Sequence, residues 1–378
     1  MSMTAVLLFD EELVRLTFIV GIAVSVLVYE RTHRTTGSLV VPGYIGASLL
    51  SPFALLTTGV NAVITWFLVA RVLPRFAAVY GRTLFVVNIA VSVALSMLFG
   101  PVLGSVLPTN VPHLDTIGYV IPALIAYDMN RQGPSRTAST VAVTGLIAAT
   151  PALILVALRP GAVDPVLPVD TVLRGLDDFW LAIAALVSVG VATLLHSGHH
   201  LRCGGFIGAM YIGLMAGEPV AVVFVAVVAL VTYAFVQYVL KPFMIVFGRR
   251  KFAIVLMSGS VLSWTTLEAA GHWLPGVLSL EGLPIAVLFV PALLANDMER
   301  TSVPEVLVGT TVAAAATVST VVVLMGIVDF QPIPSWAMPA MLIAGFVLVA
   351  PRIWPALDTM RVPSPPSFDP QVPIAQQL

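Results

Sequence analysis

The sequence predicts an all-α membrane protein, a polytopic helix bundle of about 13 transmembrane segments. Of its 378 residues, 58% are hydrophobic and only 10% are charged, and the mean hydropathy is +1.01. Soluble domains carry about 25% charged residues. The apolar residues fall in runs that approach the roughly 20 residues needed to cross a bilayer as a helix. A third observation is that long and short runs follow the same order in two halves of the chain.

The apolar runs give two sets of six candidate spans. The first set lies near 13–29, 38–57, 60–79, 83–104, 117–127 and 137–158. The second lies near 178–195, 203–217, 219–240, 252–272, 283–296 and 303–328. A further run at 336–354 has no counterpart in the first half. We therefore expect a first repeat (1–158), an external linker (159–177), a second repeat (178–328), an extra C-terminal helix (329–362) and a disordered Pro- and Gln-rich tail (363–378).

Local sequence identity supports a duplication. "PALIAYDMNR" at 122–131 recurs as "PALLANDMER" at 291–300, with seven of ten positions the same. "GYIGA" from Gly43 recurs as "GFIGA" from Gly205, and "YGRTLF" from Tyr80 recurs as "FGRRKF" from Phe247. The offsets of 169, 162 and 167 residues require only small insertions. Six crossings per unit would place two parallel repeats about an axis along the membrane normal.

The basic residues predict an orientation, because Lys and Arg collect in short cytoplasmic loops. With the N-terminus outside, 15 of the 18 basic residues fall in cytoplasmic loops and the C-terminus is cytoplasmic. Arg15 lies near the start of the first span, where it can pair locally with Glu11 or Glu12. If the short runs 117–127 and 283–296 were re-entrant, the second half would invert and "FGRRKF" would face outward. Crossing segments are therefore favoured.

Several spans contain helix-breaking residues. Pro122 and Pro291 lie inside short apolar runs, and Pro42 with Gly43, and Gly205 in the other half, interrupt two more. A proline inside a helix removes a hydrogen bond, and the freed backbone must face protein or a water-filled cavity. These segments are expected to be broken helices that face the bundle interior. Ordinary kinks with close glycine packing are the structural alternative.

Two Asp–Arg pairs follow the short runs. Asp128 and Arg131, and Asp297 and Arg300, are spaced i, i+3, so each pair shares a helix face. The arginines can serve as cytoplasmic boundary anchors, or they can bind the carboxylates of an anionic substrate, because guanidinium pairs with carboxylate bidentately.

"FGRRKF" gathers Arg249, Arg250 and Lys251 in one cytoplasmic turn, and Arg82 is its first-half counterpart. Such clusters commonly contact anionic lipid. Docking of an acidic protein surface or of an anionic polymer is the sharper hypothesis.

Motifs for cofactors are missing from the sequence. Cys203 is the only cysteine, which excludes an intramolecular disulfide framework. "HSGHHLRC" spaces three histidines and Cys203 like metal ligands, but the first repeat has no match, so we interpret it as a polar loop and expect no metal site. There is no P-loop, dinucleotide fingerprint or His-Glu-x-x-His motif, so no cofactor is expected.

Three segments resemble a known family. "ERTHRTTGSLVVPGYIG" from Glu30, "VIPALIAYDMNRQG" from Val120 and "FGRRKF" from Phe247 resemble the poly-γ-glutamate biosynthesis membrane proteins called CapC or PgsC. Each half is similar to one family member, so the chain looks like two fused units; whether they replace a homodimer stays open. The halves depart differently: the first has "YGRTLF", losing the second Arg and the Lys. The second half has "CGGFIG" in place of Val-Pro-Gly-Tyr and lacks the Glu-Arg-Thr that precedes this motif in the first half. It has "NDMERTS" in place of the Arg-Gln-Gly ending.

The resemblance implies a membrane subunit of a poly-γ-glutamate synthase and exporter. It would anchor a cytosolic, Mur-ligase-like, ATP-dependent amide ligase of the CapB or PgsB type and help form the polymer path. Other expected partners are capsule subunits of the CapA or PgsA type, the polymer and membrane lipid, and no nucleic acid. Whether this subunit is co-catalytic stays open. The alternatives are a secondary transporter for a small anionic solute such as glutamate, or a scaffold whose basic loops bind only lipid.

Overall fold

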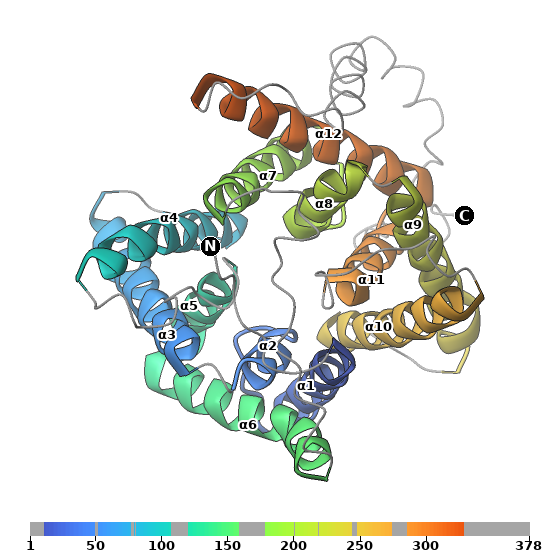
Figure 1. Cartoon of the computed structure of the whole chain (residues 1–378), viewed down its shortest axis with the longest axis horizontal. Coiled ribbons are helices and arrows are strands. Elements are labelled where there is room, and N and C mark those ends of the chain that lie inside the picture. The colour runs from blue at the N-terminus through green and yellow to red at the C-terminus, as the bar shows by residue number, and fades with distance from the viewer. Residues whose placement is uncertain are drawn as a thin grey trace, which may run out of the picture.

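The computed structural model describes residues 11–49, 52–76, 79, 81–106, 120–158, 178–199, 201–217, 219–243, 248–273 and 286–328. Within these ranges the chain forms α-helices joined by short connections, without a strand (Figure 1). The first half contains α1 (Glu11–Thr32), α2 (Val41–Ala47), α3 (Pro52–Phe67), α4 (Gly81–Val106), α5 (Ile121–Gln132) and α6 (Pro134–Leu158). The second contains α7 (Asp178–His199), α8 (Gly205–Leu214), α9 (Pro219–Ala234), α10 (Gly248–Trp273), α11 (Ala286–Met298) and α12 (Val303–Val328).

The predicted all-helical membrane architecture is confirmed for the described residues. Six helices there are long and apolar enough to cross a membrane: Glu12–Thr32, Ala54–Arg75, Pro134–Leu155, Pro219–Leu240, Gly248–His272 and Val303–Gly326. Four further apolar stretches are shorter, at Thr83–Leu98, Trp180–His196, Gly205–Leu214 and Leu288–Met298. The chain is thus a multi-pass membrane protein, and crossings beyond these six stay a prediction. The expected linker 159–177, the helix at 336–354 and the tail 363–378 lie outside the described residues.

The prolines do not all break helices as the sequence suggested. The run 38–57 is divided into α2 and the start of α3, and Pro42 occupies the first turn of α2. Pro122 likewise occupies the first turn of α5, so it begins that helix instead of interrupting one. A first-turn proline loses no intrahelical hydrogen bond, since that N–H has no partner in a helix anyway. Pro291 does lie inside its helix, α11.

Glycines open two helices of the second half. Gly204 and Gly205 precede and begin α8 with φ of +65° and +70°. Gly248 begins α10 with φ of +61°, and its counterpart Gly81 begins α4 with φ of +60°. Only glycine adopts this left-handed conformation without a steric penalty. Both copies of the "GR" turn therefore use the same backbone geometry.

The helices pack in matching pairs in the two halves. In the first half α1 packs against α2 and α6, and α5 against α3 and α4. In the second half α7 packs against α8 and α12, and α11 against α9 and α10. Between the halves, α10 packs against α1 and α4 packs against α7. Figure 1 shows the short helices α2, α5, α8 and α11 on the inner side of the longer ones.

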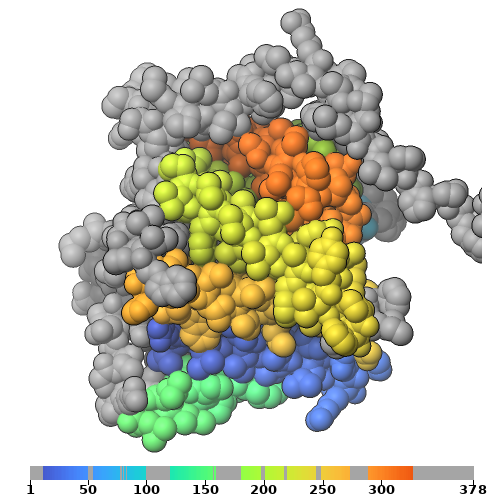
Figure 2. Space-filling view, turned by 90° about the vertical axis from the view of Figure 1, so that its right-hand side faces the viewer, coloured from blue at the N-terminus to red at the C-terminus, as the bar shows by residue number. Residues whose placement is uncertain are grey.

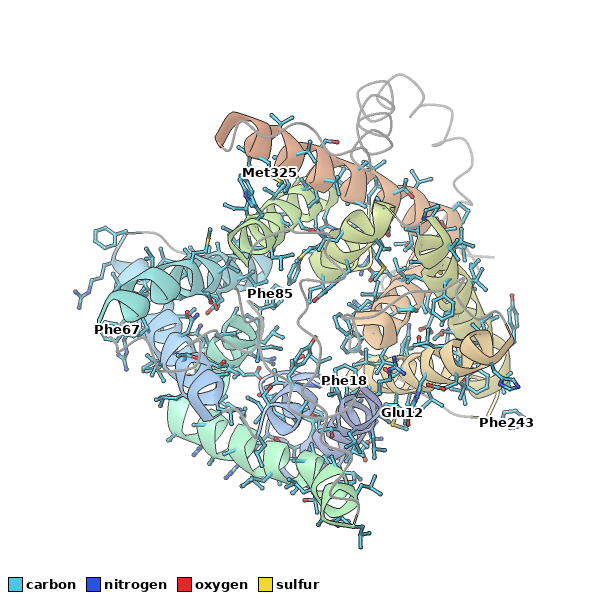
Figure 3. All side chains as sticks on the ribbon, viewed as in Figure 1. Glu12, Phe18, Phe67, Phe85, Phe243 and Met325 are labelled. Atoms are coloured by element: carbon cyan, nitrogen blue, oxygen red, sulfur yellow. The ribbon has the colours of Figure 1, made fainter. Side chains whose placement is uncertain are left out.

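The largest apolar cluster joins the halves. Phe18 of α1 is fully buried, and its ring lies 5.8 Å from that of Tyr44 and 6.1 Å from that of Phe289 (Figure 3). Tyr211 of α8 lies 6.0 Å from Phe289 on the other side. This aromatic row runs from α2 through α1 and α11 to α8, so the core is shared between the two halves.

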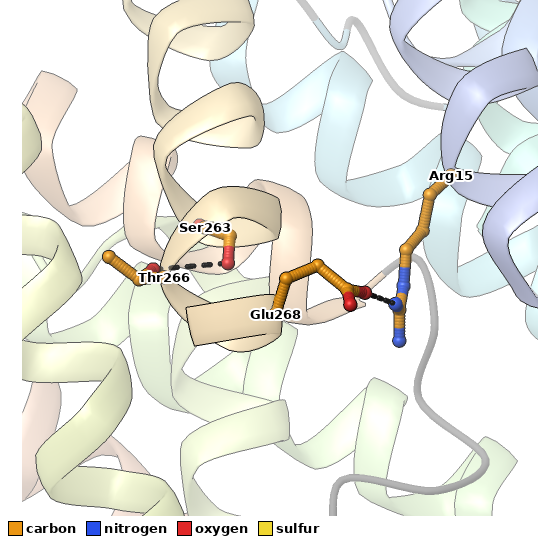
Figure 4. A network of polar contacts seen from close by, with 4 residues as sticks. All are labelled: Arg15, Ser263, Thr266 and Glu268. Atoms are coloured by element: carbon orange, nitrogen blue, oxygen red, sulfur yellow. Dashed lines mark hydrogen bonds and ion pairs between the residues drawn. The ribbon is translucent and has the colours of Figure 1, made fainter. Parts of the chain in front are cut away.

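Helices α1 and α10 are held at both ends by ion pairs. Arg15 Nη1 lies 3.3 Å from Glu268 Oε1 near the start of α1 and the end of α10 (Figure 4). Arg250 Nε lies 2.7 Å from Glu30 Oε1 at the opposite ends of the two helices. The helices are therefore antiparallel, and Figure 2 shows α10 (gold) lying along α1 (blue). Sequence proximity suggested Glu11 or Glu12 for Arg15; the structure adds a partner 253 residues away.

Helices α1 and α2 touch backbone to backbone. A Cβ on Gly21 would overlap the backbone N and Cα of Gly43, and a Cβ on Gly43 would lie 2.7 Å from the Cα of Phe18. Small residues let membrane helices approach this closely, and the resulting van der Waals contact helps to hold such helices together. At Gly43 the close-packing alternative is therefore the one observed.

Gly21→Ala is expected to destabilise the protein by about 1–3 kcal/mol, because backbone at this contact cannot move aside as a side chain can. Gly190→Ala is the matched control, since a Cβ there meets no atom within 4 Å. It should be neutral, or stabilising by up to about 1 kcal/mol. Thermal unfolding of the purified protein in detergent measures both. Equal midpoints for the two variants would contradict the close contact.

Candidate functional site

The connection between α1 and α2 (residues 33–40) is held by side chains of α5. The Gly37 N–H donates to Asp128 Oδ2 at 2.9 Å. The Gln132 side chain accepts from the Thr35 N–H at 3.0 Å and donates to the Thr35 carbonyl at 2.6 Å. The connection is not regular, with φ of +56° at His33 and +82° at Gly37, so its peptide groups need partners outside secondary structure. Asp128 and Gln132 supply them.

Asp128 is a buried carboxyl at the end of α5, beyond the apolar run and outside the six candidate spans. Its residue exposure is 4%. Burial raises the pKa of the Asp128 carboxyl, and the positive charges of Arg249 and Arg131 and the Gly37 N–H oppose that rise. Two arginines from different halves of the chain therefore lie close enough to act on one carboxyl.

The start of α10 meets the end of α1 in a group that we call the inter-half cluster. It comprises Tyr29, Glu30, Asp128, Arg131, Arg249 and Arg250. The Arg249 guanidinium carbon lies 4.6 Å from the centre of the Tyr29 ring, within range of a cation–π contact. Arg250 pairs with Glu30, and both side chains keep contact with solvent, at 66% and 37% exposed. Arg131 is also exposed.

A second group, the second-half cluster, lies at the end of α11. It comprises Arg202, Lys241, Lys251, Asp297, Glu299 and Arg300. Glu299 Oε1 lies 2.6 Å from Lys241 Nζ and 3.0 Å from Lys251 Nζ, and its side chain is only 3% exposed. Arg202 Nη1 lies 3.6 Å from Asp297 Oδ1. Burial raises the pKa of Asp297, which Arg202, Arg300 and the Gly205 N–H oppose.

The structure divides the predicted site residues between these clusters. Asp128, Arg131, Arg249 and Arg250 come together, and Lys251 turns to Glu299 beside Asp297 and Arg300. Arg82 is the second residue of α4, and its side chain lies outside the described residues. Each aspartate has the i+3 arginine nearby and is also contacted from another segment, Asp128 by Gly37 and Asp297 by Arg202.

Sequence reasoning missed Tyr29, Gln132, Lys241 and Glu299 as members of the site, and it left Glu30 without a role. Glu30 and Gln132 lie within the quoted motifs "ERT" and "RQG", which was the available signal. No such signal was present for Glu299 and Lys241, because the corresponding first-half positions are occupied by Asn130 and Pro74. A comparison of the two halves therefore could not identify them.

The contacts gather both Asp-Met-x-Arg segments at one end of the bundle. Arg250–Glu30 joins the start of α10 to the end of α1, and Lys251–Glu299 joins the start of α10 to the end of α11. Gly37–Asp128 joins the connection after α1 to the end of α5. This end of the bundle thus presents the predicted arginines.

Asp128→Leu is expected to destabilise the protein by about 1–3 kcal/mol, because the buried Gly37 N–H loses its acceptor. Asp128→Asn keeps an oxygen at the same place and should lose less. Arg136→Gln, at an exposed position just after α5, should stay within about 0.5 kcal/mol of the parent. Thermal unfolding in detergent gives the order. A variant Asp128→Leu as stable as Arg136→Gln would show that the carboxylate does not hold the connection.

Comparisons with known proteins give the chain a family. The model of the family described as capsule biosynthesis CapC matches residues 20–138 and again 187–307. Each match runs from the first helix of a half to the last, so the predicted duplication is confirmed.

Two relatives each match about a third of the chain. A "Capsule biosynthesis protein CapC" of Bacillus anthracis is 29% identical over 131 residues, which are 34% of this chain and 87% of the relative. A "PGA biosynthesis protein CapC" of Bacillus subtilis (strain 168) is 33% identical over 125 residues, 32% of this chain and 78% of the relative. No solved structure matches the chain. Because the two matched segments together cover more than half of its residues, the chain belongs to the capsule biosynthesis CapC family.

Proposed function

We propose that the chain is a membrane subunit of a complex that synthesises and exports poly-γ-glutamate. The observation that carries this proposal is the family match over both halves, together with relatives named for capsule and PGA biosynthesis. The gathered arginines support it, because a polymer of carboxylates requires cationic contacts at the place where it is held.

The proposal includes two repeats that lie the same way up in the membrane. The matching order of six helices and the matching helix pairs support it. The ion pairs that gather the ends of α1 and α11 with the start of α10 support it independently. Since basic residues favour the cytoplasm, the clustered end would face inward and the N-terminus outward. A crossing at 336–354 would then leave the C-terminus in the cytoplasm.

The cytoplasmic end would receive the partners. A Mur-ligase-like enzyme of the CapB or PgsB type would form the amide bonds with ATP, since the sequence here carries no nucleotide motif. The exposed Arg131 and Arg300 would bind polymer carboxylates, and Arg249, Arg250 and Lys251 would contact the ligase or the nascent chain. Subunits of the CapA or PgsA type would complete the complex, and the bundle would form part of the polymer path.

The variant carrying Arg131→Ala and Arg300→Ala is expected to reduce cell-surface polymer at least tenfold, because a single lost charged contact to a carboxylate is worth about 1.5–3 kcal/mol and about 1.4 kcal/mol already corresponds to a tenfold change in binding. Arg75→Ala, at an exposed arginine outside both clusters, is the control. Polymer is measured in cells that also carry the ligase, with the membrane protein quantified by immunoblot. Undiminished polymer at normal protein level would contradict these roles. Uptake of glutamate into vesicles without any ligase would instead favour a transporter.

Cysteine labelling tests the orientation. In a Cys203→Ser background, cysteines replacing Arg136 and Thr301 should resist a membrane-impermeant maleimide in intact cells and react in inside-out vesicles. A cysteine replacing His272, exposed at the far end of α10, should react in intact cells. Labelling of positions 136 and 301 from opposite sides would refute parallel repeats.

A further inference from the structure

We infer that the inter-half cluster is one carboxylate-binding site which only the pairing of the two halves completes, and that the counterpart contact between the halves lacks an equivalent of its Arg250–Glu30 pair. This inference rests on the proposed function and deepens it, because it names where the polymer's carboxylates are bound and shows which residues each half supplies.

The site draws on both halves. The first half supplies Tyr29 and Glu30 from the end of α1 and Asp128 and Arg131 from the end of α5. The second half supplies Arg249 and Arg250 from the first turn of α10. Arg249 contacts the Tyr29 ring and acts on Asp128, while Arg250 pairs with Glu30 at 2.7 Å. Neither half alone contains this set.

One partner in the site is exchangeable and the others are fixed. The Arg250–Glu30 pair is largely exposed, and exposed ion pairs contribute little to stability, so an incoming carboxylate can replace Glu30 on Arg250. Arg249 is held in place by the Tyr29 ring, and Asp128 is engaged by the Gly37 N–H. Arg131 stays exposed beside them. Three guanidinium groups are thus presented together, each able to bind a carboxylate bidentately.

The counterpart contact, between α4 and α7, has no equivalent of the Arg250–Glu30 pair, although Arg82 corresponds to Arg249. Helices α1 and α7 have the same length of 22 residues, and in that register Ser197 corresponds to Glu30. In the register of the two "GR" turns, Thr83 corresponds to Arg250. The described part of the contact is filled by Ile89 and Val93 of α4 against Ala182 and Val189 of α7. It is an apolar contact.

The connecting segment differs in the same sense. The register between the halves falls from 167 at the "GR" turns to 162 at "GYIGA", so the segment between α7 and "GFIGA" is five residues shorter than the segment between α1 and "GYIGA". The shorter connection brings Arg202 and the Gly205 N–H to Asp297, where the longer one brings the Gly37 N–H to Asp128. Asp297 is thereby committed to its own half. The two related contacts between the halves therefore differ at the positions of Glu30 and Arg250.

Binding by the purified full-length protein tests the inference. The probe is a synthetic γ-linked glutamate oligomer of defined length, added to the protein in a non-ionic detergent. The variant with Arg249→Gln and Arg250→Gln should bind it about tenfold or more weakly, because two charge-assisted contacts are lost. Arg250→Lys keeps the charge but not the planar fork, and it should fall between this variant and the parent.

The matched control changes the corresponding positions of the other contact, Thr83→Ala with Ser197→Ala, and its affinity should stay within about twofold of the parent. If the Arg249 and Arg250 variant unfolds, Arg131→Gln replaces it, because that exposed side chain lies outside the α1–α10 contact and its loss should also weaken binding. Thermal unfolding in the same detergent identifies folded variants.

Three results would overturn the inference. The folded arginine variants could bind the oligomer with unchanged affinity, or the Thr83 and Ser197 changes could weaken binding equally. The third result is that the cluster binds anionic lipid but no oligomer. Cell-surface polymer separates these failures from failure of the proposed function. If polymer still requires this chain, the function stands and the site lies elsewhere; if deletion of the chain leaves polymer unchanged, the proposed function fails as well.

Discussion

The antiparallel contact between α1 and α10 is the interaction on which the rest of the structure depends. The hydrophobic effect does not drive helices together within a lipid bilayer, so a membrane bundle is stabilised by close packing and by polar contacts. This contact has both. Phe18 and Leu256 are fully buried in its apolar cluster, and an ion pair joins the two helices at each end. The same contact brings Arg249 to Asp128, so the packing that joins the halves also assembles the inter-half cluster.

Much of the fold could be predicted from the sequence. Apolar runs and their punctuation located most of the helices in the described ranges to within a few residues, because span length and charge position are set by the bilayer. The prediction that prolines break helices was wrong for Pro122, which lies in the first turn of α5. The apolar run before Pro122 did not indicate that a helix starts there. The close backbone approach of Gly43 in α2 to Gly21 is likewise a tertiary contact, which the apolar run 38–57 did not indicate.

The site was predictable in composition but not in arrangement. The repeated Asp-Met-x-Arg and the basic turn marked Asp128, Arg131, Arg249 and Arg250, but local spacing assigned each aspartate to its neighbouring arginine. Glu30 and Arg15 each form an ion pair with a residue in the other half of the chain. The spacing of residues along one sequence does not predict such pairs. Glu299 could not be predicted for a different reason. It pairs with two lysines in a buried position, and the first half has no corresponding pair that a comparison of the repeats could reveal.

The sequence separation of Arg15 and Glu268 sets how early the contact between α1 and α10 can form during biogenesis. The residues are 253 positions apart, so α1 leaves the ribosome long before its partner α10. At translation rates of about 5–20 residues per second, the delay is on the order of 10–50 s. Helix α1 must therefore reside in the bilayer without α10 for that time, and synthesis of α10, not diffusion, sets the earliest moment at which this contact forms.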